Sequence, residues 1–152
     1  MPIKEDIAKN KITESMLLPH LRIAGTGAGR GGETLSIAER MPAGEAVDVG
    51  DALYCASDGK VYRADNTNEK PCHFFAVSAA AAEEDVAIAV SGFLDYEDTL
   101  FTTGSAVFIT SGTPNISTSP PAAITGHIYQ RIGTAISESG IYISIEPEQY
   151  VE

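Results

Sequence analysis

Catalysis by a serine or cysteine nucleophile needs a histidine held beside it, and this chain has three histidines. His20 lies in the N-terminal region and His127 at the expected start of a strand. His73 adjoins Cys72, but neighbours on a strand point to opposite faces of the sheet, so these two side chains are badly placed to act together. The spacing therefore predicts no base–nucleophile pair, and we expect a protein that is not an enzyme. A small hydrolase or isomerase would need such a pair.

A cluster of carboxylates, Asp95, Glu97 and Asp98, has ligand types that suit calcium. The cluster lacks the glycine turn and the final glutamate of an EF-hand loop, and Tyr96 interrupts it. We interpret it as a solvated link between two repeated segments and expect no metal site.

Two further motifs point away from cofactors. The segment Gly27–Gly32 satisfies G-x-G-x-x-G, but a dinucleotide site needs a helix to follow, and Thr34–Ala38 is typical of extended chain. Cys55 and Cys72 match no zinc spacing, and two thiols do not make a disulfide framework. We expect reduced, inert cysteines and no cofactor.

The charge is unevenly distributed along the chain, whose net charge is −11. Residues 1–40 carry six basic and five acidic side chains, whereas residues 41–152 carry four and sixteen. An acidic body repels phosphate, so we expect binding neither to nucleic acid nor to an anionic membrane. Lys60 and Arg63 flank one hairpin and could hold an anion, although solubilising charges are the simpler interpretation.

Several longer features concern where the protein acts. No hydrophobic run approaches the roughly 20 residues of a membrane span, and the N-terminus lacks the apolar core of a signal peptide. We therefore expect synthesis in the cytoplasm without translocation. Residues 99–130 contain no formally charged side chain. Such a stretch fits an interface between copies or with a partner, or a neutral surface rich in loops.

The elements that must position these residues begin after an N-terminal arm. A short helix from about Asp6 to Leu18 is possible, ended by Pro19, and the glycines of 25–32 form a flexible linker. We interpret residues 1–33 as an arm and a Gly-rich hinge. Residues 34–152 then form one β domain, because short alternating segments lie between turns there.

This domain contains an internal repeat, since the second half repeats the order, spacing and turn chemistry of the first. The matching segments are residues 50–55 and 104–109, 57–60 and 111–113, 61–63 and 116–118, 74–79 and 131–136, and 86–90 and 141–145. The sequence thus predicts an all-β fold, a compact β-barrel or sandwich built from two similar four-strand units, with an extended N-terminal arm.

Two stretches of the domain carry a family resemblance. Ala43–Tyr54 followed by Ser57–Ala64 resembles the small capsid decoration (cement) proteins of tailed bacteriophages. Gly126–Ala135 is similar to a β module at the ends of phage fibre proteins. The resemblance covers residues 41–146 and leaves the arm unmatched.

The resemblance implies a non-enzymatic virion protein on the capsid exterior, often a homo-oligomer and frequently a trimer, that clamps the major capsid protein. The arm would then supply the contacts to the capsid, through Ile12, Leu17, Leu18, Leu21 and Arg22. An alternative for these five residues is a short helix packed on the protein's own body.

The competing function is a receptor- or glycan-binding module of a tail fibre or baseplate. Such a module needs an exposed aromatic platform, for which Tyr96, Phe101 and Tyr129 are the candidates. A place in the core is the alternative for these rings.

Overall fold

The computed structural model describes residues 36–152, which form an all-β fold without a helix. The predicted arm and hinge, the possible helix from Asp6 to Leu18 and the five proposed arm contacts lie outside these residues. The strands are β1 Ser36–Pro42, β2 Ala52–Cys55, β3 Val61–Arg63, β4 Phe74–Ala76, β5 Asp85–Asp95, β6 Ala106–Ile109, β7 Ile116–Ser117, β8 Ile128–Tyr129, β9 Arg131–Ser137, β10 Gly140–Ser144 and β11 Gln149–Tyr150.

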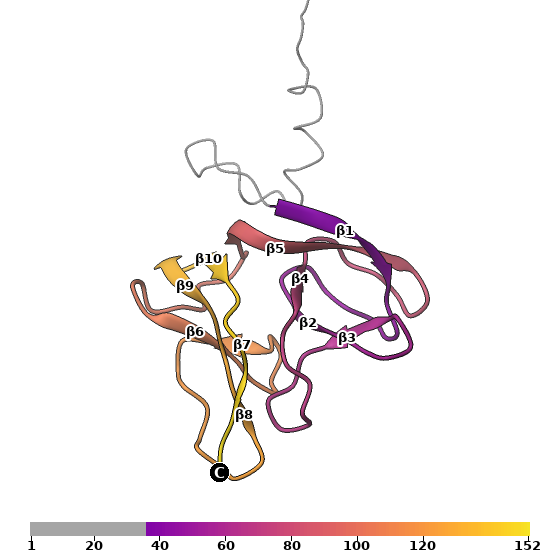
Figure 1. Cartoon of the computed structure of the whole chain (residues 1–152). Coiled ribbons are helices and arrows are strands. Elements are labelled where there is room, and N and C mark those ends of the chain that lie inside the picture. Colours follow the sequence, from indigo (N-terminus) through magenta and orange to yellow (C-terminus); the bar gives the residue numbers. More distant parts are fainter. Residues whose placement is uncertain (1–35) are drawn as a thin grey trace, which may run out of the picture.

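The long strand β5 runs along the top of the molecule in Figure 1 and connects its two halves. Its first part pairs with β1 along one edge and with β4 along the other, so Val86–Ala89 is buried and apolar throughout. Its last part, residues 91–95, pairs with β10. Gly92, with φ +112°, lies where the pairing changes from one neighbour to the next.

The strand order of the main sheet confirms the predicted order of the repeat, whereas the predicted alignment of residues 74–79 with 131–136 is wrong by two residues. Phe75 pairs with Ala52 and Thr134 pairs with the equivalent Ala106, so Phe75 corresponds to Thr134. The order β3-β2-β4-β5-β10-β9-β6-β7 gives each strand of the first unit (β2 to β5) a counterpart at the mirrored place in the second unit (β6, β7, β9 and β10). Equivalent turns make equivalent hydrogen bonds: Gly50 N–H donates to the Ala76 carbonyl at 2.8 Å, and Gly104 N–H to the Ala135 carbonyl at 2.7 Å. Two similar four-strand units therefore share one curled sheet, shaped like half a barrel.

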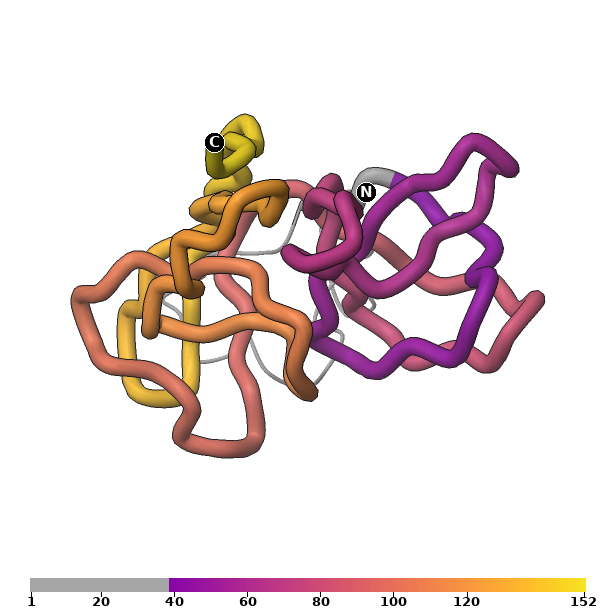
Figure 2. The backbone as a smooth tube through the Cα atoms, turned by 90° about the horizontal axis from the view of Figure 1, so that it is seen from below, coloured from indigo at the N-terminus to yellow at the C-terminus, as the bar shows by residue number. Residues whose placement is uncertain are grey.

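The hydrophobic core divides into two clusters. The larger one takes side chains from both units, with Phe75 and Leu94 of the first unit beside Ile109, Ile132 and Ile141 of the second. The smaller one belongs to the first unit and takes side chains from β2, β3, β4, β5 and the loop between β1 and β2. Figure 2 shows the two units as lobes side by side. Because they share the larger cluster, neither lobe has a complete core of its own.

A small second sheet forms the end of the molecule opposite β1. There β8 pairs with β11, and the C-terminus lies at the bottom of Figure 1. The Ile128 N–H donates to the Asn66 carbonyl at 2.8 Å, so this sheet is also tied to the first unit.

Candidate functional site

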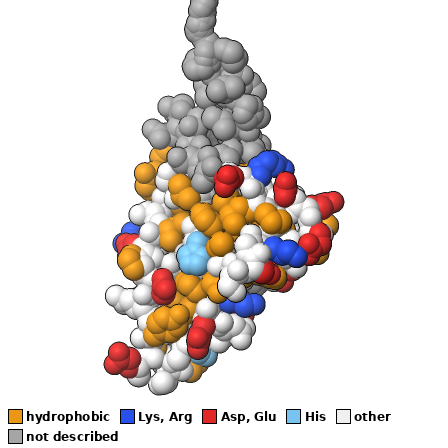
Figure 3. All heavy atoms as spheres, turned by 45° about the vertical axis from the view of Figure 1, so that its right-hand side comes forward, with side chains coloured by type: hydrophobic (Ala, Val, Ile, Leu, Met, Phe, Trp, Pro, Cys, Tyr) orange, Lys and Arg blue, Asp and Glu red, His pale blue; other side chains and the backbone are white. Residues whose placement is uncertain are grey.

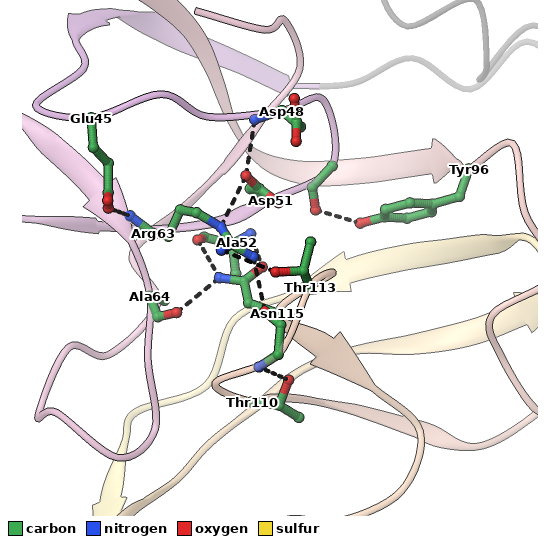
Figure 4. A network of polar contacts seen from close by, with 12 residues as sticks. Glu45, Asp48, Asp51, Ala52, Arg63, Ala64, Tyr96, Thr110, Thr113 and Asn115 are labelled. Carbon is green, nitrogen blue, oxygen red and sulfur yellow. Dashed lines mark hydrogen bonds and ion pairs between the residues drawn. The ribbon is translucent and has the colours of Figure 1, made fainter. Parts of the chain in front are cut away.

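The candidate site is the junction of the two units, where the loop before β2 and the end of β3 meet the β6–β7 turn (Figure 4). Three of the four buried polar or charged side chains among the described residues hold segments together in or near this junction. They are Asp51, Asn115 and Gln130.

Asp51 and Arg63 form an ion pair within the first unit. The Asp51 carboxylate is 5% exposed, and its Oδ2 lies 3.2 Å from Arg63 Nε. The same oxygen accepts the Asp48 N–H at 2.9 Å. Loss of solvent raises the pKa of Asp51 above its usual value, although the Asp48 N–H and the Arg63 charge act in the opposite direction.

Arg63 also reaches across to the second unit. Its Nη2 donates to the Gly112 carbonyl at 2.9 Å, and its Nη1 lies 3.4 Å from Thr113 Oγ1. Its backbone N–H donates to Glu45 Oε2 at 2.8 Å. Arg63 therefore connects three segments, and its charge is neutralised by Asp51.

The amide of Asn115 is inserted into the backbone pairing of the first unit. Its Oδ1 accepts the Ala52 N–H at 3.0 Å, and its Nδ2 donates to the carbonyls of Ala52 and Ala64 at 2.8 and 2.9 Å. All three groups belong to the end of the β2–β3 ladder, so one side chain takes the place of a neighbouring strand. This buried amide has partners for both of its ends.

Gln130 makes a second link of the same kind. Its Oε1 accepts the Cys72 N–H at 2.7 Å, and its Nε2 donates to the carbonyls of Cys72 and Glu146 at 3.0 and 2.8 Å. The loop before β4 is thus joined both to the second unit and to the segment that follows β10.

Tyr96 covers one side of the junction. Its hydroxyl donates to the Gly50 carbonyl at 2.8 Å, and a Cβ built on Gly50 would lie 2.3 Å from the ring. Gly50 has φ +93°, so this position requires glycine for both its backbone and its contact. Burial raises the pKa of the Tyr96 hydroxyl well above its usual value, and the nearby Asp51 charge adds to this effect.

An acidic cleft of about 570 Å³ lies beside these contacts. Five carboxylates and several apolar side chains line it, and no lysine or arginine does; the acids are Asp48, Asp51, Asp95, Glu97 and Asp98. Within residues 36–152 no group of three or more His, Cys, Asp or Glu side chains is arranged to hold a metal ion.

The structure separates the side chains that could have formed a nucleophile–base pair. Cys72 is buried, and desolvation raises the pKa of its thiol to about 12, which leaves it protonated and unreactive. His73 is exposed, and its Nδ1 accepts the Cys55 N–H at 3.0 Å. His127 lies beside β8, in the small sheet.

The two cations that flank the first hairpin are paired with carboxylates. Lys60 Nζ lies 2.8 Å from Glu83, and Arg63 is held by Asp51. These contacts favour a structural role over the anion site that the sequence left open.

The aromatic platform expected from the sequence is divided by the fold. Phe101 is 6% exposed and belongs to the core, and Tyr96 is partly buried and meets it edge to face at 5.2 Å. Tyr129 is 37% exposed and packs on Phe108 at 5.0 Å. The three candidates therefore do not form one surface.

No local pattern in the sequence predicts the roles of Asn115 and Gln130. The partners of Asn115 lie 51 and 63 residues away, and Cys72 lies 58 residues from Gln130. Local periodicity contains no signal for such pairs. The one usable signal was the place of each amide in the sequence: Asn115 directly precedes Ile116, and Gln130 lies two residues after Ile128. A polar amide so close to apolar strand residues indicates a buried polar group that needs hydrogen-bond partners.

No protein-family model, curated protein or solved structure matches this chain. The class that the structure itself defines is an all-β protein with two repeated units on one curled sheet. Among residues 36–152 the structure has no helix of the length and apolar character required to span a membrane.

Proposed function

We propose that this protein is a virion structural protein that binds the outer surface of a phage capsid and stabilises it by clamping the major capsid protein. The observation that carries the proposal is the use of the buried polar groups. Asn115 and Gln130 join the two units, Asp51 neutralises the arginine that reaches across, and the thiol of Cys72 is protonated. Together with the family resemblance, this supports a rigid binding body better than a catalyst.

The shape of the body suits attachment from one end. Strand β1 begins at Ser36, beside Ser91 of β5, whereas the C-terminus lies at the opposite end (Figure 1). In the proposed function residues 1–33 contact the capsid, and the acidic body lies at a junction between capsomers, as a homo-oligomer. A protein that binds only the assembled shell shifts the equilibrium away from disassembly, and a repeated lattice multiplies modest contacts.

The first test is the copy number of this protein in purified virus particles, measured by quantitative mass spectrometry against the major capsid protein. Decoration predicts many copies in a fixed ratio to the shell protein. A handful of copies would favour a fibre or baseplate protein, and none would rule out both virion functions.

The second test addresses the arm. Particles lacking the protein are mixed with the full chain, with a variant that carries Leu17→Asp and Leu18→Asp, or with Lys70→Ala as a matched change on the body. We expect the double variant to lose binding to the capsid and Lys70→Ala to keep it. Equal binding by all three would show that these leucines make no essential contact.

A further inference from the structure

One edge of β5 lacks a partner strand along part of its length. At Ser91 the strand has neighbours on both edges, because Ser91 pairs with Ser36 of β1 and with Ser144 of β10. The next residues, Gly92–Leu94, pair with β10 and with no other strand that the structure describes. The edge that β1 occupies is therefore open along Gly92–Leu94, and Figure 1 shows β5 extending past the start of β1.

The backbone of Phe93 faces this open edge. The Tyr96 N–H donates to the Ser139 carbonyl at 2.6 Å, on the side of β5 where β10 lies. Because the backbone groups of successive strand residues point to alternate edges, Leu94 also faces β10, and Phe93 faces away from it. The N–H and C=O groups of Phe93 are therefore placed to bond one further strand.

Apolar side chains lie beside the open edge. Phe93 and Tyr142 are register partners, and their rings meet edge to face at 5.2 Å. Tyr142 is 42% exposed, and Val90, which the register between β1 and β5 skips, is 39% exposed. Exposed apolar side chains alone do not tell what covers them, as the hydrophobic side chains around a histidine in Figure 3 illustrate. An open apolar strand edge is more specific, because it pairs with an extended chain.

The chain that precedes Ser36 leads to this edge. Strand β1 runs antiparallel to β5, so each step back along the chain from Ser36 is matched by a step forward along β5. In this register Thr34 falls opposite Phe93. By its sequence Thr34–Ala38 is typical of extended chain, and the glycine-rich linker ends before it. The direction of β1 and the sequence before it therefore indicate the same occupant.

We propose that β1 extends to Thr34, which pairs with Phe93 and covers the open edge of β5. The Thr34 N–H donates to the Phe93 carbonyl, and the Phe93 N–H donates to the Thr34 carbonyl. One strand thus lines β5 both in the first unit and where β5 joins the second unit through β10. This pairing is independent of the capsid function, and it fixes the point at which the N-terminal segment leaves the body.

Amide hydrogen exchange of the full-length protein, measured for each residue by NMR, tests the pairing. We expect slow exchange at Thr34 and Phe93 and fast exchange at Leu35, whose N–H points away from β5. Thr34→Pro removes the donor and should speed exchange of the Phe93 amide about tenfold or more, while Leu94, which faces β10, keeps its rate. Thr26→Pro, the same change within the glycine-rich linker, is the control and should leave both rates unchanged.

Three results of the exchange experiment would overturn the proposal. The first is exchange of the Phe93 amide at the rate of an unprotected amide, and the second is an unchanged Phe93 rate in Thr34→Pro. The third is equal acceleration at Phe93 and Leu94, which would show a general loss of stability and not the loss of one strand pair.

A second readout identifies the source of the strand. In a mixture of isotope-labelled and unlabelled chains, isotope-filtered NOE spectra are expected to show contacts between Thr34 and Phe93 within one chain only. Contacts between chains would assign the strand to a second copy of the protein and would overturn the proposal.

Discussion

At the scale of single residues, the repeat provides an internal comparison for the buried acid. Asp51 and Ser105 occupy equivalent places: the Asp51 N–H donates to the Asp48 carbonyl at 3.2 Å, and the Ser105 N–H to the Thr102 carbonyl at 3.1 Å. The turn therefore forms without a carboxylate. The acid of the first unit is explained instead by Arg63, whose charge it neutralises.

Asp51 gives the stability a defined pH dependence. Because its pKa is raised in the folded protein, the folded state binds this proton more tightly than the unfolded chain does. The contribution of Asp51 to stability is thus greatest when it is protonated, and it is lost as the pH rises from 3.8 through the raised value. We expect that the free energy of unfolding of Asp51→Asn, measured by urea unfolding at a series of pH values, lacks this decrease above pH 3.8.

Asp65 is the matched control, with the opposite sign. Burial acts to raise its pKa, but hydrogen bonds from Thr67 and Asn68 outweigh burial and hold the pKa below its usual value. Its contribution is present above pH 3.8 and is lost as the pH falls through the lowered value. If Asp65→Asn altered the pH dependence of stability in the same pH range as Asp51→Asn, the result would contradict this assignment.

The two equivalent glycines should differ in their tolerance of a side chain. Gly50→Ala places a methyl group against the Tyr96 ring and strains the backbone, so we expect a loss of about 3 kcal/mol or more in the free energy of unfolding. Gly104 has φ +86°, but no atom lies within 4 Å of the place that a methyl group would take, so Gly104→Ala should cost only the backbone strain, about 1–2 kcal/mol. Equal losses in denaturant unfolding would show that the Tyr96 contact is unimportant.

At the scale of elements, the Asn115 side chain makes the hydrogen bonds that a neighbouring strand would otherwise make at the end of the β2–β3 ladder. Backbone groups at the end of the β2–β3 ladder need partners, and the Asn115 amide supplies one acceptor and two donors. The short strand β7 brings this amide to the ladder directly after the β6–β7 turn. The junction therefore depends on the orientation of the Asn115 amide, with its oxygen facing the backbone N–H and its nitrogen facing the two carbonyls.

Replacement of Asn115 tests this dependence. Asn115→Asp puts an oxygen against the carbonyls of Ala52 and Ala64, and we expect a loss of about 3–5 kcal/mol in the free energy of unfolding at pH 7. Lower pH should restore part of this loss, since a protonated carboxyl can donate one bond. Gln149→Glu, the same amide-to-acid change at an exposed position, is the control and should change stability little.

At the scale of the whole molecule, the two units fold as one body. Their central strands β5 and β10 pair directly, and the larger core cluster takes side chains from both units. The isolated first unit would expose Phe75 and Leu94, which are fully buried in the intact protein. Separation of the units therefore removes apolar burial that each of them needs.

We expect a single cooperative unfolding transition. Far-UV circular dichroism and tyrosine fluorescence should give the same urea midpoint, and a fragment of residues 36–98 should show no cooperative transition. Two resolved transitions, or a folded fragment, would show that the units are independent.

Local pattern in the sequence determined the class of the fold and its repeat. Alternating segments between Gly, Pro and Asp-Gly turns predicted strands. The same order of segments in the two halves of the domain predicted two four-strand units, as the strand order of the sheet confirms. The alternation of extended chain also predicted that Cys72 and His73 point in opposite directions, and the structure adds that Cys72 is the buried one. These features depend on residues close in the chain, whose geometry is set by the backbone itself.

Only the tertiary structure decided which distant groups meet. The contacts of Arg63 with the β6–β7 turn, of Asn115 with Ala52, and of Gln130 with Cys72 join residues about fifty or more positions apart. It also placed Phe101 in the core with Tyr96 packed against it, and brought Tyr54 beside His73. Such pairs arise from the curl and pairing order of the whole sheet, which depend on burial of a shared core and not on any local pattern.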